Sequence, residues 1–132
     1  MMDTDMDYAG LAKAGSSLGT GAVIVLNETR CMVATLVKLS HFYSEESCGQ
    51  CTPCREGVGW LYRIVRTIAE GSAREGDIEM LESVARSLQG ATVCGLGQAA
   101  TLPVLSFLSH FRDEFVRHMV GTGSRIAAEN RT

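Results

Sequence analysis

Three of the five cysteines are crowded into seven residues, and a fourth stands alone further along the chain. Cys48, Cys51 and Cys54 form the triplet C-x2-C-x2-C, and Cys94 is the distant fourth member. Four cysteine thiolates are the usual ligand set of a [4Fe–4S] cluster, in which each thiolate holds one corner. Because spacing of three alone does not make such residues converge, we expect the triplet to lie outside regular helix. The sequence has no second triplet, so the limit is one cluster.

Structural zinc is the main alternative for these cysteines. Zinc sites usually collect their ligands as two separated pairs, so a triplet plus a single cysteine fits an iron–sulfur cluster better. A disulfide is not expected in a reducing compartment. A third alternative is a degenerate fragment that holds no metal and is stabilised by its helices alone. The spacing therefore favours iron–sulfur and leaves a zinc-binding interaction domain and a metal-free fragment open.

Two residues near this pattern have separate interpretations. Cys31 stands alone on an expected helix, beside its apolar face, and is interpreted as a small buried thiol rather than a ligand. Arg55 directly follows Cys54, and its charge could offset the negative charge of a cluster. It could equally form a surface ion pair with Glu46 or Glu56, and the sequence leaves both roles open.

The histidines and two large aromatic residues carry no recognisable site. His41, His110 and His118 lack metal-ligand spacing and are expected on helix surfaces, whereas Trp60 and Phe111 are expected in the core. The sequence contains no phosphate-binding loop, dinucleotide fingerprint, serine-hydrolase elbow or zinc-protease motif. No catalytic residue is therefore predicted.

Apolar residues recur every three or four positions in four segments, as on one face of an amphipathic helix. The four apolar stripes are Met32, Leu36, Leu39 and Tyr43; Val58, Leu61, Val65 and Ile68; Ile78, Leu81, Val84 and Leu88; and Val104, Leu108, Phe111, Phe115 and Met119. The first helix is expected over about residues 28–43. Pro103 is expected to open the fourth helix and Gly121 to follow its end. The pattern predicts a mainly α fold, a small four-helix bundle.

The stretch before these helices has a different character. Residues 1–20 are polar or small and end in glycine-rich sequence, which predicts a loop or tail. Residues 22–26, Ala-Val-Ile-Val-Leu, predict a short buried strand. One strand cannot pair with itself, so either its partner is elsewhere in the chain or its sheet belongs to a missing region.

Composition limits the class of protein. The chain has 132 residues, 45% of them hydrophobic and 20% charged, which is the balance of one soluble domain. A net charge of −3 argues against nucleic-acid binding, which needs a basic surface. No apolar run is long enough to span a bilayer, and the acidic start does not resemble a signal peptide. A cytosolic protein is expected.

The residues around the cysteine triplet closely resemble the signature of a known family. Residues 45–57, Glu-Glu-Ser-Cys-Gly-Gln-Cys-Thr-Pro-Cys-Arg-Glu-Gly, are similar to a stretch of the NADH-binding flavoprotein subunit of respiratory complex I (NADH:quinone oxidoreductase). The resemblance runs from about Met6 to His118. It includes residues 15–21, 92–97 and 107–115.

This resemblance implies that Cys48, Cys51, Cys54 and Cys94 bind one [4Fe–4S] cluster. In that family the cluster takes electrons singly from reduced FMN and passes them to the next iron–sulfur centre. The chain would then be an electron-transfer module of a respiratory-chain oxidoreductase. Its expected partners are other peripheral-arm subunits, namely the flavin-bearing region and the iron–sulfur subunits, with no nucleic acid and no direct membrane insertion. Its expected place is cytoplasmic, peripheral to the membrane within a larger complex.

The resemblance also implies a division of the chain. Residues 1–27 would be a loop and the remnant β-strand of a preceding β-grasp (soluble-ligand-binding) domain, which would explain the unpaired strand. Residues 28–121 would form the iron–sulfur helical bundle, and residues 122–132 a flexible tail. We therefore expect the chain to be a segment of a larger protein or a separately encoded piece of one.

Two departures from the family are informative. The FMN- and NADH-binding region is missing, so FMN and NAD are expected only in the absent part of the parent subunit, and no NADH oxidation is expected from this chain alone. After Cys94 the family often has Ala-Leu-Gly-Asp, whereas this chain has Gly-Leu-Gly-Gln and lacks that carboxylate. Subunits of NAD-reducing hydrogenases and NAD-dependent formate dehydrogenases share the signature and are alternative parents.

Overall fold

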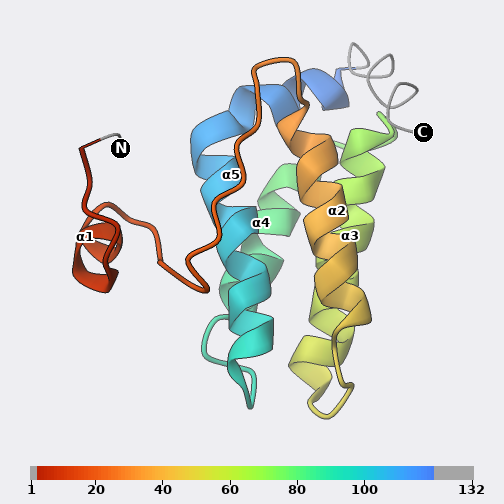
Figure 1. Cartoon of the computed structure of the whole chain (residues 1–132). Helices are drawn as coiled ribbons and strands as arrows, with labels where there is room; N and C mark the ends of the chain where they lie inside the picture. Colours follow the sequence, from red (N-terminus) through yellow and green to blue (C-terminus); the bar gives the residue numbers. More distant parts are fainter. Residues whose placement is uncertain (1–2, 121–132) are drawn as a thin grey trace.

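The computed structural model describes residues 3–120, and they are mainly helical as expected. Five helices follow one another in this range, and it contains no β-strand. The helices are α1 (Tyr8–Lys13), α2 (Met32–Glu45), α3 (Thr52–Ala69), α4 (Asp77–Leu88) and α5 (Gly95–Met119). Helices α2 to α5 pack against one another, while α1 stands apart on the N-terminal segment (Figure 1).

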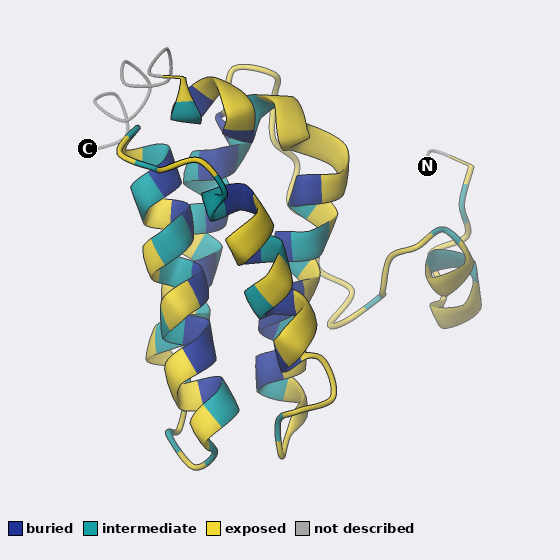
Figure 2. Cartoon of the chain, turned by 180° about the vertical axis from the view of Figure 1, so that it is seen from behind, coloured by how far each residue is buried: buried dark blue, intermediate teal, exposed yellow. Residues whose placement is uncertain are grey.

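The core lies between α2, α3, α4 and α5, where the predicted apolar stripes meet. Figure 2 shows the buried residues on the facing sides of these helices and the exposed residues outside. The fully buried side chains include Leu36, Leu61, Leu81, Val104 and Phe115, one or more from each helix. Four segments therefore share one apolar core, which positions the loops that join them.

The predicted strand at residues 22–26 is wrong. This segment is extended but pairs with no other strand in residues 3–120, and its side chains are exposed, with Val25 at 87%. A strand needs a neighbouring strand to satisfy its backbone groups, and apolar β-branched composition alone does not provide one. Within the expected loop of residues 1–20 the short helix α1 begins instead, capped by the Asp7 carboxylate, which accepts a 2.6 Å hydrogen bond from the Gly10 N–H.

The start of the last helix also differs from the prediction. Helix α5 begins at Gly95 rather than at Pro103, and Pro103 lies inside it. The backbone leaves helical geometry at Phe111, where φ is −128° and ψ is 23°. The first bundle helix begins at Met32 rather than near residue 28 and extends to Glu45. Gly121 lies outside the described residues.

Two aromatic residues expected in the core are on the surface. Trp60 is 50% exposed and Phe111 is 36% exposed. Trp60 lies one residue before the buried Leu61 and so faces outward, over the shallow groove between α3 and α4. Phe111 sits at the break in α5, which turns its side chain away from the stripe formed by its neighbours. None of the helices in residues 3–120 combines the length and hydropathy needed to cross a bilayer.

Candidate metal centre

The four predicted ligands line one pocket of about 250 Å³. They reach it from two loops that lie at the same end of the helices (Figure 1). Cys54 is buried, Cys51 is half-buried, and Cys48 and Cys94 are exposed. All four are free thiols. The other lining residues are Glu46, Gln50, Val93 and Leu96.

Helix N-termini position three of these thiols. Cys51 is the N-cap of α3 and Cys94 is the N-cap of α5. Cys54 lies inside the first turn of α3, so the expectation that the whole triplet lies outside regular helix is wrong for this residue. Pro53 fits this turn because its missing N–H would have no partner there in any case. Two helix ends, each with unpaired N–H groups and a partial positive charge, therefore face the pocket.

The loop that carries Cys48 is held from the other side by Arg55. Gly49 has a φ of +75°, a left-handed conformation that glycine adopts without strain. The Arg55 guanidinium donates hydrogen bonds to the Gly49 carbonyl at 3.0 Å and to the Thr52 hydroxyl at 3.5 Å. It also pairs with Glu56 at 3.2 Å, which is one of the two roles left open by the sequence. Arg55 thus ties the triplet loop to the first turn of α3.

Hydrogen-bonding groups lie close to two of the sulfur atoms, that of Cys51 and that of Cys54. Backbone hydrogen bonds, first from Val93 and then from Cys54, lower the pKa of the Cys51 thiol below its usual 9.0. The hydroxyl of Ser47 lies 3.3 Å from the sulfur of Cys54. The sequence did not single out Ser47 or Val93. Each directly precedes a predicted ligand, Cys48 or Cys94, and this position in the sequence could have indicated their role.

The turn that presents Cys94 is packed closely against the first turn of α5. The Thr92 hydroxyl donates a 2.9 Å hydrogen bond to the Cys94 carbonyl. Gly97 is buried directly beneath Thr92, so a Cβ atom at this position would collide with the threonine side chain. Glycine at position 97 therefore allows the 92–94 turn to approach the helix.

No three His, Cys, Asp or Glu side chains of residues 3–120 converge closely enough to hold a single metal ion. The thiols instead surround a pocket, each reaching it from its own position.

The remaining sequence predictions have mixed outcomes. Cys31 is buried, as expected, but the surface position predicted for His118 is wrong: it is 4% exposed and lies against Cys31. Its partner is 87 positions away in the sequence, so local spacing could not reveal it. His110 is exposed, as predicted. His41 is also on the surface, 3.6 Å from the Glu45 carboxylate.

Comparisons with known proteins agree with this site. The family model described as "NADH-ubiquinone oxidoreductase-F iron-sulfur binding region" matches residues 34–118. The chain is 41% identical to the NADH-quinone oxidoreductase F subunit of Rickettsia felis over 126 residues, which are 96% of this chain and 30% of that protein. It is 50% identical over 109 residues to the mitochondrial NADH dehydrogenase [ubiquinone] flavoprotein 1 of Dictyostelium discoideum, covering 83% of this chain and 23% of that protein.

A solved structure is also similar. The crystal structure of NAD+-reducing [NiFe]-hydrogenase in the H2-reduced state matches 75% of this chain and 17% of the compared chain, with a TM-score of 0.71 and 34% sequence identity. The chain thus spans less than a third of the length of the curated relatives described above.

Proposed function

The chain belongs to the family of NADH-ubiquinone oxidoreductase-F iron–sulfur binding regions, and we propose that it binds one [4Fe–4S] cluster through Cys48, Cys51, Cys54 and Cys94. When bound, the cluster supplies one-electron transfer. In that role it would accept single electrons from FMN held by another part of the parent subunit and would pass them to the next iron–sulfur centre.

The observation that carries this proposal is the meeting of the four thiols at one pocket. They come from the loop and first turn at the start of α3 and from the turn before α5, which most of α3 and all of α4 separate in sequence. A pocket lined by four free cysteines supplies the four-thiolate ligand set of a [4Fe–4S] cluster.

The electrostatic surroundings support a negatively charged group. A [4Fe–4S] cluster with four thiolates carries a net charge of about −2 in its oxidised state. The N-termini of α3 and α5 face the pocket, and Arg55 holds the loop between Cys48 and Cys51 through the Gly49 carbonyl. Donors to the sulfur atoms, such as the Ser47 hydroxyl, stabilise electron density on the ligands and tune the reduction potential.

We assign the rest of the chain by its relation to this site. Helices α2 to α5, within residues 28–121, form the four-helix bundle that holds the cluster loops rigid. Residues 1–27 belong to a preceding unit, and the flavin-bearing region and further iron–sulfur subunits are the partners. The similarity to an NAD+-reducing hydrogenase supports that class of complex as an alternative parent.

Anaerobic reconstitution of two cysteine variants tests the ligand assignment. Cys94→Ser is expected to lose most of the cluster. Cys31→Ser is the matched control, since serine is also a good N-cap and Cys31 lies outside the pocket. Reconstituted wild type and Cys31→Ser are expected to be brown, and Cys94→Ser colourless or nearly so. Equal iron and colour in all three proteins would overturn the assignment.

A further inference from the structure

A buried thiol–imidazole pair lies at the end of the helices opposite the four cluster thiols. Cys31 is the N-cap of α2, and His118 lies in the last turn of α5 (Figure 1). The Cys31 sulfur is 3.2 Å from Nε2 of His118. The two residues are 7% and 4% exposed. This distance is within the range expected for a nucleophile and its base.

The hydrogen bonds around His118 define the direction of proton transfer. Nδ1 of His118 lies 3.2 Å from the carbonyl oxygen of Ala69, and a carbonyl oxygen can only accept. Nδ1 therefore carries the hydrogen, which leaves Nε2 of the neutral ring as an acceptor. The Cys31 thiol is then the donor to Nε2. The imidazole is oriented by a third group and is ready to take the thiol proton.

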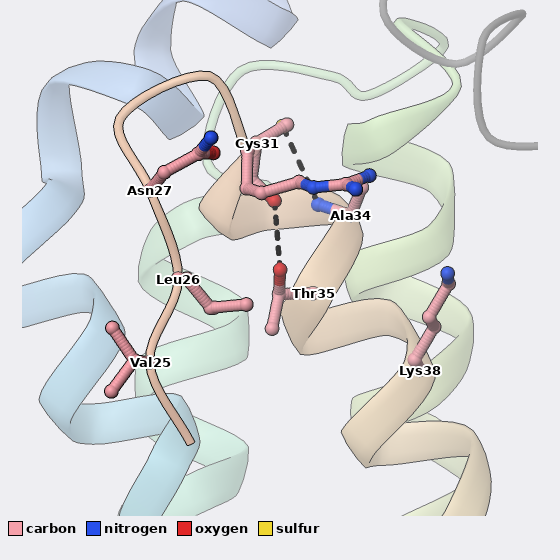
Figure 3. A pocket seen from close by; sticks show the side chains of 8 residues that line it. Val25, Leu26, Asn27, Cys31, Ala34, Thr35 and Lys38 are labelled. Carbon is pink, nitrogen blue, oxygen red and sulfur yellow. Dashed lines mark hydrogen bonds between the residues drawn. The ribbon is translucent and has the colours of Figure 1, made fainter.

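A backbone donor also points at the sulfur. The N–H of Ala34 donates to the Cys31 sulfur at 3.5 Å, an interaction drawn in Figure 3. The N–H of Met32 donates a hydrogen bond to the Glu114 carboxylate at 2.9 Å. The end of α2 therefore directs one N–H to a carboxylate and another to the thiol. Negative charge that develops on the sulfur would be stabilised by this N–H and by the helix end.

Cys31 forms part of the wall of a pocket of about 650 Å³. Figure 3 shows the pocket between the segment before α2, with Val25, Leu26 and Asn27, and the first turns of α2. Arg30 and Lys38 also line it, and no carboxylate does. The pocket thus places two positive charges next to Cys31, whose thiol is paired with a base.

We propose that Cys31 is a nucleophilic thiol that undergoes exchange with small anionic disulfides. The thiol proton moves to Nε2 of His118, and the sulfur attacks one sulfur of the disulfide. A new S–S bond joins Cys31 to one half of the reagent while the original S–S bond breaks. The leaving thiolate takes the proton from His118, so no external oxidant is required. Arg30 and Lys38 favour reagents that carry carboxylates.

Peptide mapping can follow this reaction without interference from the cluster cysteines. Cleavage by trypsin after Arg30 and Lys38 isolates Cys31 in residues 31–38, which contain no other cysteine. The cluster-loaded chain is incubated with oxidised glutathione as the anionic disulfide or with cystamine as the cationic one. The rate at which the Cys31 peptide gains each adduct is measured by mass spectrometry. We expect oxidised glutathione to react faster than cystamine.

Two variants, each with a matched control, test separately the role of His118 as a base and the role of the positive charge of Arg30. His118→Gln is expected to slow modification by both reagents about tenfold or more, whereas His110→Gln, exposed on the same helix, leaves it unchanged. Arg30→Gln is expected to slow only the anionic reagent, by about threefold or more. Because this variant lacks the cleavage site after position 30, its Cys31 peptide covers residues 14–38, which contain no other cysteine. Arg74→Gln, in the exposed loop before α4, is its control. If His118→Gln does not fold, the Arg30 comparison still tests the pocket.

Two results would overturn the proposal. One is modification of Cys31 only under conditions that unfold the chain, which would make it an inert core thiol. The other is equal rates for both reagents together with no difference between the Arg30 and Arg74 variants, which would show that the pocket does not guide the reaction.

Discussion

At the scale of single residues, hydrogen bonds to sulfur connect the parts of the proposed cluster site. Val93, beside Cys94, provides the leading hydrogen bond to the Cys51 sulfur, and Ser47, beside Cys48, lies against the sulfur of Cys54. When Cys54 is a thiolate it can only accept, so Ser47 becomes the donor. The loops are thus coupled through sulfur hydrogen bonds as well as through the proposed cluster.

Removal of the Ser47 hydroxyl is expected to make the cluster harder to reduce. A hydrogen bond to a ligand sulfur stabilises the more negative, reduced state, so Ser47→Ala is expected to shift the reduction potential to a more negative value. A redox titration of the reconstituted chain measures the shift, with Ser83→Ala on the exposed face of α4 as the control. A potential equal to that of the wild type would show that this hydroxyl does not act on the cluster.

Two neighbouring glycines in α5 are expected to differ sharply. Gly97→Ala places a Cβ against the stiff side chain of Thr92 and displaces the turn that carries Cys94. We expect a loss of about 1–3 kcal/mol in the free energy of unfolding and weaker cluster retention. Gly95→Ala meets nothing within 4 Å and serves as the control. Chemical denaturation and iron content check both variants, and equal behaviour would contradict the steric account.

The sequence could predict which thiols meet, but not what surrounds them. The spacing of Cys48, Cys51 and Cys54 is a local signal, and Cys94 is the only other cysteine in a similar glycine-rich context. The contact between Cys31 and His118 has no such signal, because it depends on how the ends of α2 and α5 align after packing.

At the scale of elements, the site is built from helix starts. Cys51 and Cys94 cap α3 and α5, so the geometry of the pocket follows from where these two helices begin. The sequence pattern placed the start of the last helix at Pro103 because proline is common at a first helical position. The structure starts this helix at Gly95, where the earlier residues are too small and polar to form a clear apolar stripe.

A charged network joins α4 to α5. Glu82 accepts from Arg86 at 2.7 Å on its own helix and lies 3.6 Å from Arg112 of α5, and Arg112 also pairs with Glu79 at 2.7 Å. The hydrogen bond from Arg86, followed by its charge and that of Arg112, lowers the pKa of the Glu82 carboxyl below its usual 4.5. The ionised Glu82 carboxylate therefore adds to the free energy of unfolding at a pH above its usual pKa. This stabilisation is lost as the pH falls through the lowered pKa of the folded state.

Glu82→Gln is therefore expected to lower the melting temperature slightly at neutral pH. Because the groups are exposed, the difference from the wild type should shrink as salt is added. Thermal unfolding at low and high ionic strength measures it. Glu75→Gln, an exposed carboxylate in the loop before α4, is expected to have no effect. If the melting temperature of Glu82→Gln were lower than that of the wild type by the same amount in high salt, the result would contradict an electrostatic cause.

At the scale of the whole molecule, one core lies between the proposed cluster ligands and the Cys31–His118 pair, which are at opposite ends of the same helices. The four cluster thiols lie where α3 and α5 begin, and the thiol–imidazole pair lies where α2 begins and α5 ends. The core between them was largely predictable, since residues such as Leu61, Leu81 and Val104 follow the helical stripes. The surface position of Trp60 was not, because large apolar character does not specify which way a side chain faces.

This division between core and surface gives a direct test. Phe115→Ala removes a fully buried ring and is expected to cost about 3–5 kcal/mol in the free energy of unfolding. Trp60→Ala removes a larger ring that is half exposed, and we expect a clearly smaller loss. Denaturant unfolding of both variants measures the difference, and a larger loss at Trp60 would contradict the packing described here.

The central claim is that this chain holds one [4Fe–4S] cluster, and the most direct measurement is the content of iron and acid-labile sulfide per chain after anaerobic reconstitution. We predict about four iron atoms and four sulfides per chain, with a spectrum that bleaches on one-electron reduction. Fewer than about three irons per chain, or one tightly bound zinc ion without sulfide, would contradict the claim.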